Sequence, residues 1–349
     1  RMDAKGYLRL CTRQQTVRLM GNVISPEVAA LAEEFGSPMF TELARRPELQ
    51  PEARQVADAV LSAANEALRA PDRLRDLISK LGAPSPDVRA RAMAGLKDTG
   101  RAGVLALIEA LGDDARAELH PYVRAALVHI GHDAVGPLVG VVEGAEPKLR
   151  AQAIRLLGRM EARETAVYLL RPYVSEASDP AVREAAGAGL KRLLGHLPNR
   201  GQAVALLRAR AESYFHGEQA IRAGADGKVE SWHWDEEKGC PVSRRDPPED
   251  AARTRAARLA AEAFALAPGN PAIRRLYPMT VLDQAACDTG RGKPLAPDHA
   301  AVREAERLGV RTVEAVLAEA VETDHVAAAT AAARILGRLG TADELLDGR

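Results

Sequence analysis

The sequence predicts an all-α fold in which pairs of helices stack into an α-solenoid, with one small β-hairpin inserted. A short pattern recurs six times: a proline, any residue, a small or apolar residue, and then usually an arginine. The prolines lie 25 to 35 residues apart, a period typical of stacked repeats. Aromatic residues make up only 3% of the chain, so we expect a core of small and aliphatic side chains, which suits closely packed helices.

Each pattern marks the start of the first helix of a pair. Proline inside a helix costs about 3 kcal/mol, because its missing N–H removes a hydrogen bond of the helix. At the first helical position no hydrogen bond is removed, because the N–H there has no acceptor within the helix. Ser25, Ser85 and Asp179 precede their prolines as N-caps. In the first pattern, Pro26 is followed by Ala29 where arginine is expected. The other five patterns contain Pro51 and Arg54, Pro86 and Arg89, Pro121 and Arg124, Pro147 and Arg150, and Pro180 and Arg183.

A second apolar helix is expected between one pattern and the next, over residues 104–111, 135–142, 165–174 and 202–215. In the first helices, small or apolar residues recur at a spacing of four, as at Ala92 and Leu96, which predicts one apolar stripe on each helix. A single helix cannot bury its stripe alone, so pairs must stack on pairs. Glycines are expected to end several first helices, at Gly100, Gly131, Gly158 and Gly195.

Residues 179–186 (Asp-Pro-Ala-Val-Arg-Glu-Ala-Ala) and 131–139 (Gly-His-Asp-Ala-Val-Gly-Pro-Leu-Val) resemble the first and second helices of HEAT repeats. The similarity is to the short bacterial form that is shared with phycobilisome-lyase-like repeat proteins. It covers roughly residues 20–215 and is clearest over 71–197. The resemblance implies an armadillo-type superhelix over residues 1–216.

The helical pattern is interrupted over residues 217–249, where glycine and proline accumulate. Residues 228–235 predict a short strand, 236–239 a turn and 240–243 a second strand. An isolated hairpin is marginally stable, so this one must pack on the helices. Its residues Trp232 and Trp234 lie two apart and therefore on one face. They form either the packing surface of the hairpin or an aromatic platform for a partner.

Helical character resumes over residues 250–349. Residues 256–277 resemble the end of one tetratricopeptide unit and the start of the next. After a loop at 290–298, three more helices are expected over 299–308, 311–322 and 325–339. The expected regions are therefore a HEAT-like array at 1–216, a loop with a hairpin at 217–249, and a tetratricopeptide-like and terminal helical region at 250–349.

The charge balance bears on which partners the chain attracts, and the cysteine content bears on the compartment in which it works. The 48 basic and 48 acidic residues balance, so no overall field attracts the chain to nucleic acid or to an anionic membrane. No apolar run reaches the roughly 20 residues that a membrane helix needs. The three cysteines are far apart and never in a C-x-x-C pair, which favours a reducing compartment and hence the cytoplasm. Export stays open, because the sequence starts in mid-pattern at Arg1.

The usual arrangements of catalytic and metal-binding residues are missing from the sequence. None of the eight histidines is followed by glutamate, and Glu322 to His325 is a single Glu-x-x-His, whereas a di-iron site needs two. Gly290-Arg-Gly-Lys293 lacks the strand and helix that frame a phosphate-binding loop. We therefore predict no metal, no cofactor and no catalytic residue, and no small-molecule substrate is evident.

These observations favour a non-catalytic scaffold that binds a protein or peptide on the concave face formed by the second helices. Two alternatives stay open. The resemblance to bilin lyases implies an enzyme or enzyme subunit. The five arginines of the repeated pattern could instead form a ladder that contacts the phosphates of a nucleic acid. Their structural interpretation, which we favour, is that each bonds an acidic or carbonyl group of the neighbouring helix pair.

Overall fold

The computed structural model describes residues 26–47, 50–290 and 292–347. These residues are mostly helical and include one small two-stranded sheet, which agrees with the predicted all-α class. The chain divides into two compact units that meet between Ile130 and Gly131. The predicted boundaries after residues 216 and 249 lie inside the second unit, near the end of one helix and the start of another.

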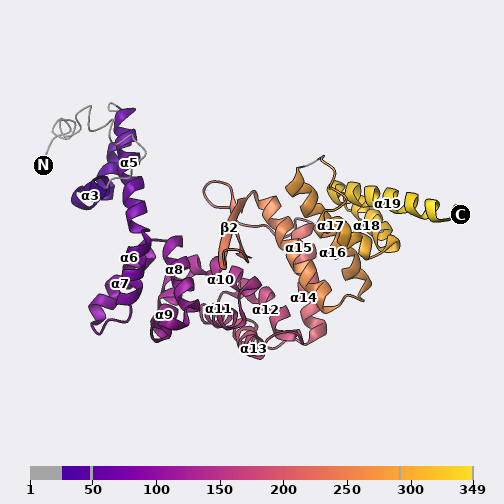
Figure 1. The fold of residues 1–349 in the computed structure, drawn as a ribbon, viewed down its shortest axis with the longest axis horizontal. Helices are drawn as coiled ribbons and strands as arrows, with labels where there is room; N and C mark the ends of the chain where they lie inside the picture. Colours follow the sequence, from indigo (N-terminus) through magenta and orange to yellow (C-terminus); the bar gives the residue numbers. More distant parts are fainter. Residues whose placement is uncertain (1–25, 48–49, 291, 348–349) are drawn as a thin grey trace. The chain divides into compact units, whose positions relative to one another are not determined.

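The first unit contains helices joined by short turns (Figure 1). Its core near the start of the chain consists of small and aliphatic side chains with one aromatic ring, Phe40. Further along, Leu96, Leu107 and Leu127 are fully buried, as the low aromatic content predicts. The helices are α3 (Pro26–Phe35), α4 (Ser37–Leu43), α5 (Glu52–Leu68), α6 (Pro71–Lys80), α7 (Pro86–Asp98), α8 (Arg101–Gly112) and α9 (His120–Ile130).

The second unit contains the remaining helices and the hairpin, which is inserted between α14 and α15. Its first part consists of α10 (His132–Gly144), α11 (Pro147–Arg159), α12 (Ala166–Val174), α13 (Pro180–Leu194) and α14 (Arg200–Phe215). The strands β1 (Val229–Asp235) and β2 (Cys240–Asp246) follow. The unit ends with α15 (Pro248–Leu266), α16 (Pro271–Thr289), α17 (Ala300–Arg307), α18 (Val310–Glu322) and α19 (Val326–Asp347).

In both units, a helix packs against the helix that follows two places later in the chain. In the first unit α6 packs against α8, and α7 against α9. In the second unit α11 packs against α13, while α10, α12 and α14 follow one another in contact. Helix α15 packs against α14 and α16, and α16 packs against α18 and α19. Each of these helices therefore has more than one neighbour against which its apolar side chains can pack.

The six prolines of the repeated pattern lie where helices begin. Helices α3, α7, α11 and α13 begin at the proline itself, α5 begins one residue after it, and α9 one residue before it. Asp179 caps α13 by accepting a hydrogen bond from the N–H of Ala181 at 2.8 Å. Ser85 makes no such bond, and Ser25 lies outside the described residues.

Three of the four glycines expected to end helices lie between helices with positive φ: Gly100 at 58°, Gly131 at 76° and Gly195 at 81°. The prediction for Gly158 was wrong, because this residue lies inside α11. A Cβ placed there would lie 3.2 Å from the Cα of Gly189 in α13. Gly158 therefore lies at a close crossing of two helices, where a Cβ would make an unusually tight contact.

The guanidinium groups of Arg89 and Arg183 bond to backbone carbonyls of the turn that precedes their own helix. Arg89 donates to two carbonyls after α6, both at 2.8 Å. Arg183 donates to three carbonyls after α12, those of Ser175, Glu176 and Ser178, at 2.9 to 3.3 Å. The carbonyls of a turn lie outside the hydrogen-bond ladder of a helix, so a guanidinium group with several donors can bond them and hold the turn against the helix that follows.

Other arginines of the second unit bond carbonyls at the ends of helices. Arg150 in α11 donates to the carbonyl of Glu143 in the last turn of α10, at 3.5 Å. Two arginines outside the repeated pattern do likewise: Arg200 bonds the carbonyl of Leu266 at 2.8 Å, and Arg274 that of Leu308 at 3.0 Å. Arginine therefore links the C-terminal end of one helix to the start of another at several points of this unit.

We expect Arg183→Met to lower the free energy of unfolding by about 1–3 kcal/mol, because hydrogen bonds to a charged group contribute about that much. Methionine keeps most of the apolar length of the side chain but none of its donors. Arg192→Met on the same helix α13 is the control, because Arg192 is exposed and should change stability by less than about 0.5 kcal/mol. Urea unfolding of the two variants measures the difference, and equal losses would contradict this role of Arg183.

Candidate functional site

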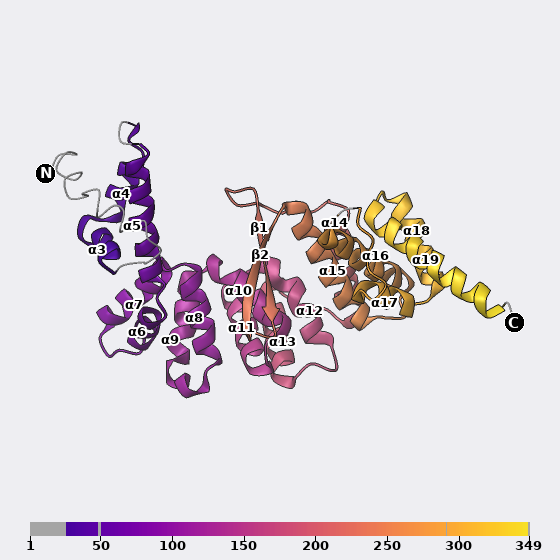
Figure 2. The same ribbon diagram turned by 45° about the horizontal axis from the view of Figure 1, so that its top comes forward.

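The hairpin presents both tryptophans on one face. Antiparallel pairing places Trp232 opposite Ser243 and Trp234 opposite Pro241, and the chain reverses over residues 236–239, as predicted. Directly opposed residues share a face of the sheet, so the two indoles and Pro241 lie on the same side. Both strands pack against α10 (Figure 2), and both also contact α15.

Three glycines on α10 form the surface that receives this face. Gly136, Gly140 and Gly144 are spaced by four residues and therefore lie on one side of the helix. A Cβ on Gly136 would lie 2.6 Å from Cδ1 of Trp232, and a Cβ on Gly144 would lie 2.6 Å from Cδ1 of Trp234. A Cβ on Gly140 would lie 3.1 Å from Cβ of Pro241. The hairpin therefore approaches α10 at a distance that only glycine permits at Gly136 and Gly144.

Each indole is half-buried, with one part against α10 and another accessible to solvent. The structure thus places Trp232 and Trp234 in a packing contact, one of the two roles that the sequence suggested. Their role in binding a partner stays a prediction.

Glu143 joins the hairpin to two helices. Its Oε2 accepts a hydrogen bond from the backbone N–H of Trp234 at 3.3 Å. The same oxygen forms an ion pair with Nη1 of Arg258 in α15, also at 3.3 Å. One carboxylate at the end of α10 therefore connects β1 with a helix more than 100 residues further along the chain.

Arg258 lies at the centre of a half-buried charged cluster. Its guanidinium carbon lies 4.7 Å from the ring centre of Tyr168 in α12, within the range of a cation–π contact. Its Nε lies 3.5 Å from Oε1 of Glu262 on the next turn of α15, while Oε2 of that carboxyl is buried without a hydrogen bond. Burial raises the pKa of Glu262 to about 7, against the opposing pull of Arg258 and Arg171. Glu262 therefore titrates near neutral pH.

A second arginine of α15 stacks on a tyrosine beside this cluster. The guanidinium carbon of Arg255 lies 5.8 Å from the ring centre of Tyr214 in α14. Within the described residues Arg255 has no carboxylate partner. We call the half-buried set of Tyr168, Tyr214, Trp234, Arg255 and Arg258 the aromatic–arginine face.

The arginines of the repeated pattern do not share one environment. Arg89, Arg150 and Arg183 bond backbone carbonyls, as described above. Arg54 instead lies 3.9 Å from Asp58 of its own helix α5, so the expectation that each arginine bonds the neighbouring helix pair was wrong for Arg54. Arg124 is half-buried in α9. Guanidinium groups bonded to carbonyls have fewer donors left for phosphates, so this geometry favours the structural interpretation over a nucleic-acid ladder.

Sequence reasoning found the tryptophans but missed the glycines of α10 on which they pack and the side chains beside them. A glycine at every fourth position of a helix is a signal of close packing that could have pointed to α10. No comparable signal identified Tyr168, Tyr214, Arg255 or Arg258. Among the described residues there is no group of three or more His, Cys, Asp or Glu side chains placed to hold a metal ion. No described helix has the length and hydropathy of a transmembrane segment.

We predict that Gly136→Ala destabilises the chain, because the new methyl group would overlap the indole of Trp232. Overpacking typically costs about 1–3 kcal/mol, from which the better helix propensity of alanine, about 1 kcal/mol, is regained. Gly337→Ala is the matched control, since nothing lies within 4 Å of a Cβ at this position in α19. Urea unfolding should show a lower free energy of unfolding for Gly136→Ala and a slightly higher one for Gly337→Ala. An increase for both variants would contradict the packing of Trp232 on Gly136.

We also predict that Glu262 makes the folded state less stable as pH rises. Its pKa is about 7 in the folded chain and close to 4.5 when unfolded, so the folded state holds the proton more tightly between these values. The free energy of unfolding should therefore fall as pH rises from 5 to 8, by up to about 3 kcal/mol.

Glu262→Gln should remove most of this decrease, because the amide keeps the shape of the carboxylic acid and does not ionise. Glu184→Gln, at an exposed position on α13, is the control and should keep the wild-type profile. Urea unfolding at several pH values measures both. An identical pH dependence in wild type and Glu262→Gln would show that the cluster does not bury this carboxyl.

Comparison with known proteins gives no relative from which a role can be taken. No protein-family model matches the chain, and no curated protein is similar enough to match it. The function must therefore be argued from the geometry of the described residues.

Proposed function

We propose that this chain is a non-catalytic scaffold that binds a protein or peptide segment on its second helices, at the aromatic–arginine face. The observation that carries the proposal is Arg255, a half-buried cation stacked on Tyr214 without a carboxylate partner among the described residues. A desolvated cation of this kind gains most from a carboxylate that a partner supplies.

The helix contacts support the underlying architecture. In each unit, first helices contact first helices and second helices contact second helices, as α11 with α13 and α10 with α12. We infer that each unit is a stack of HEAT-like pairs, and that α15 and α16 form a tetratricopeptide-like pair. Such stacks build broad surfaces from the helices of one layer, which suits binding without chemistry.

The composition of the face supports a protein or peptide as the partner. Tyrosine, tryptophan and arginine are the residues most enriched among those that dominate binding energy at protein interfaces. The chain has only 12 aromatic residues apart from histidine, yet Tyr168, Tyr214 and Trp234 gather around two arginines of α15. Each is half-buried, so it can add contact area while losing little conformational freedom on binding.

The hairpin determines where on the second helices the partner binds. Strands β1 and β2 cover α10, so that helix is not available along its glycine face. Helices α12, α14 and α15 carry the tyrosines and arginines beside the hairpin. We therefore place the partner on these three helices, with an acidic side chain against Arg255 and an apolar side chain against Tyr214.

Selection from a library of displayed random peptides tests the proposal without a known partner. The wild-type chain should enrich peptides with an acidic residue next to an apolar one, and Arg255→Glu should lose these peptides by at least about tenfold, because it replaces attraction by repulsion. Arg303→Glu is the control, since Arg303 is exposed on α17 and distant in sequence from the face.

The control should enrich the same peptides as the wild type. Equal enrichment by wild type and Arg255→Glu would contradict the proposed site. Failure of the wild type to enrich any peptide, together with retention of duplex DNA that weakens steeply with salt, would favour the arginine ladder instead.

A further inference from the structure

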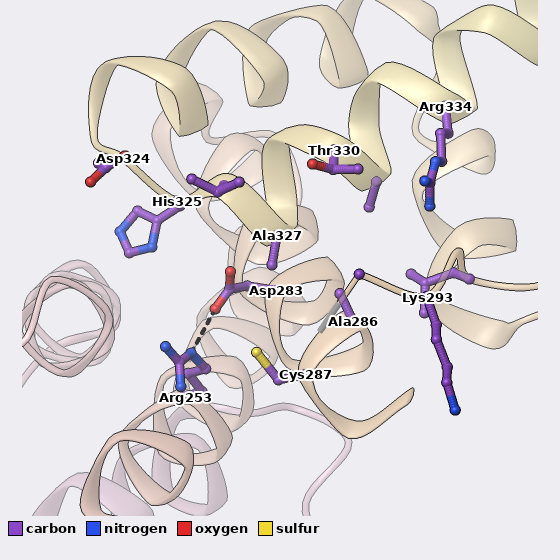
Figure 3. A pocket seen from close by; sticks show the side chains of 14 residues that line it. Arg253, Asp283, Ala286, Cys287, Lys293, Asp324, His325, Ala327, Thr330 and Arg334 are labelled. Carbon is purple, nitrogen blue, oxygen red and sulfur yellow. Dashed lines mark hydrogen bonds and ion pairs between the residues drawn. The ribbon is translucent and has the colours of Figure 1, made fainter. Parts of the chain in front are cut away.

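A cavity of about 360 Å³ lies in the second unit, away from the aromatic–arginine face. Its walls come from α15, α16, the segment after Gly292 and the start of α19 (Figure 3). Ligand pockets typically have volumes of about 300–1,000 Å³, so the cavity is large enough for a small organic molecule.

One end of the cavity holds two carboxylates, those of Asp283 and Asp324, and one arginine, Arg253. Asp283 of α16 is only 4% exposed, and its Oδ2 forms an ion pair with Nε of Arg253 at 3.0 Å. Arg253 also pairs with Asp250 at 2.8 Å. One guanidinium thus faces two carboxylates, Asp250 and Asp283, so this end of the cavity is unfavourable for an anionic group.

His325 adds a neutral surface at the same end. Its ring stacks on Phe215 with 3.7 Å between ring centres, and its Nε2 lies 3.2 Å from Nδ1 of His216. Burial lowers the pKa of His325; Asp283 and Asp324 oppose this decrease, whereas His216 and Arg253 add to it. The imidazole is thus uncharged at neutral pH, and it does not supply a cation to the cavity.

The other end carries cations that are not neutralised. Arg334 of α19 extends toward the segment that holds Lys293 (Figure 3). Neither side chain has a carboxylate partner within the described part of the chain. Between the two ends the wall is apolar and consists of small or aliphatic side chains: Ala286, Leu295, Ala327 and Ala331.

We propose that this cavity binds a small organic carboxylate, with its carboxylate group on Arg334 and its carbon chain along the apolar wall. A planar guanidinium binds a carboxylate through two parallel hydrogen bonds, which fixes the orientation of the ligand. The hydroxyl of Thr330, which also lines the cavity, offers a further donor. The site does not depend on the scaffold function, because it shares no residue with the aromatic–arginine face.

Cys287 is a built-in reporter of this site, because its sulfur lines the cavity (Figure 3). Iodoacetate and iodoacetamide are nearly equal in size, alkylate thiolates by displacing iodide, and differ in that only iodoacetate carries a carboxylate. The ratio of their rates at Cys287, measured by mass spectrometry of the alkylated peptide, reports whether the cavity attracts that group. Cys240 of β2 is an internal reference, since it does not line the cavity.

We expect Arg334→Gln to lower the iodoacetate-to-iodoacetamide ratio at Cys287 by at least about threefold and to leave the ratio at Cys240 unchanged. Arg303→Gln, at an exposed position on α17, should change neither ratio. Arg334 is exposed, so its substitution should not unfold the chain, which circular dichroism checks. An unchanged ratio at Cys287 in Arg334→Gln would overturn the proposal. Failure of Cys287 to react with either reagent would also overturn it, because the cavity would then exclude even a two-carbon solute.

Discussion

The close approach of the hairpin to α10 is the contact on which the arrangement of the second unit depends. A two-stranded sheet cannot bury its apolar face alone, and α10 cannot accept two indoles unless it lacks side chains at the points of contact. Gly136 and Gly144 supply those points for Trp232 and Trp234. The glycines lower helix propensity by about 1 kcal/mol each relative to alanine, and this cost accompanies the close contact that they permit.

This contact connects parts of the chain that are far apart in sequence. The hairpin leads directly into α15, so seating β1 and β2 on α10 also brings Arg258 to Glu143 and Tyr168. Arg255, one turn earlier in α15, stacks on Tyr214 of α14. The proposed binding face is therefore a consequence of the hairpin rather than a property of the repeated pattern. The arginines of that pattern serve a different purpose, since Arg89 and Arg183 bond carbonyls of the turns before their helices, and Arg150 bonds a carbonyl in the last turn of α10.

Local chemistry predicted most of the elements, although it missed α4 and α6, whereas contacts between distant elements escaped prediction. Proline at a first helical position and the Trp-rich strand with its turn are short-range signals, and the helix starts and the hairpin lie where these signals place them. Gly158 was misjudged because a glycine near a helix end has two physical explanations, a left-handed cap and a close crossing, and only the position of Gly189 decides between them. The cavity could not be foreseen, because Arg253, Asp283 and Arg334 converge from three helices with no shared motif.

Quenching of tryptophan fluorescence by acrylamide tests the packing of the hairpin on α10 most directly, because Trp232 and Trp234 are the only tryptophans in the chain. If both indoles pack on the glycines of α10, the native emission should be shifted to the blue of free tryptophan and should be quenched several-fold more slowly than in the urea-unfolded chain. A native emission at the wavelength of free tryptophan, quenched as readily as in the unfolded chain, would contradict the account.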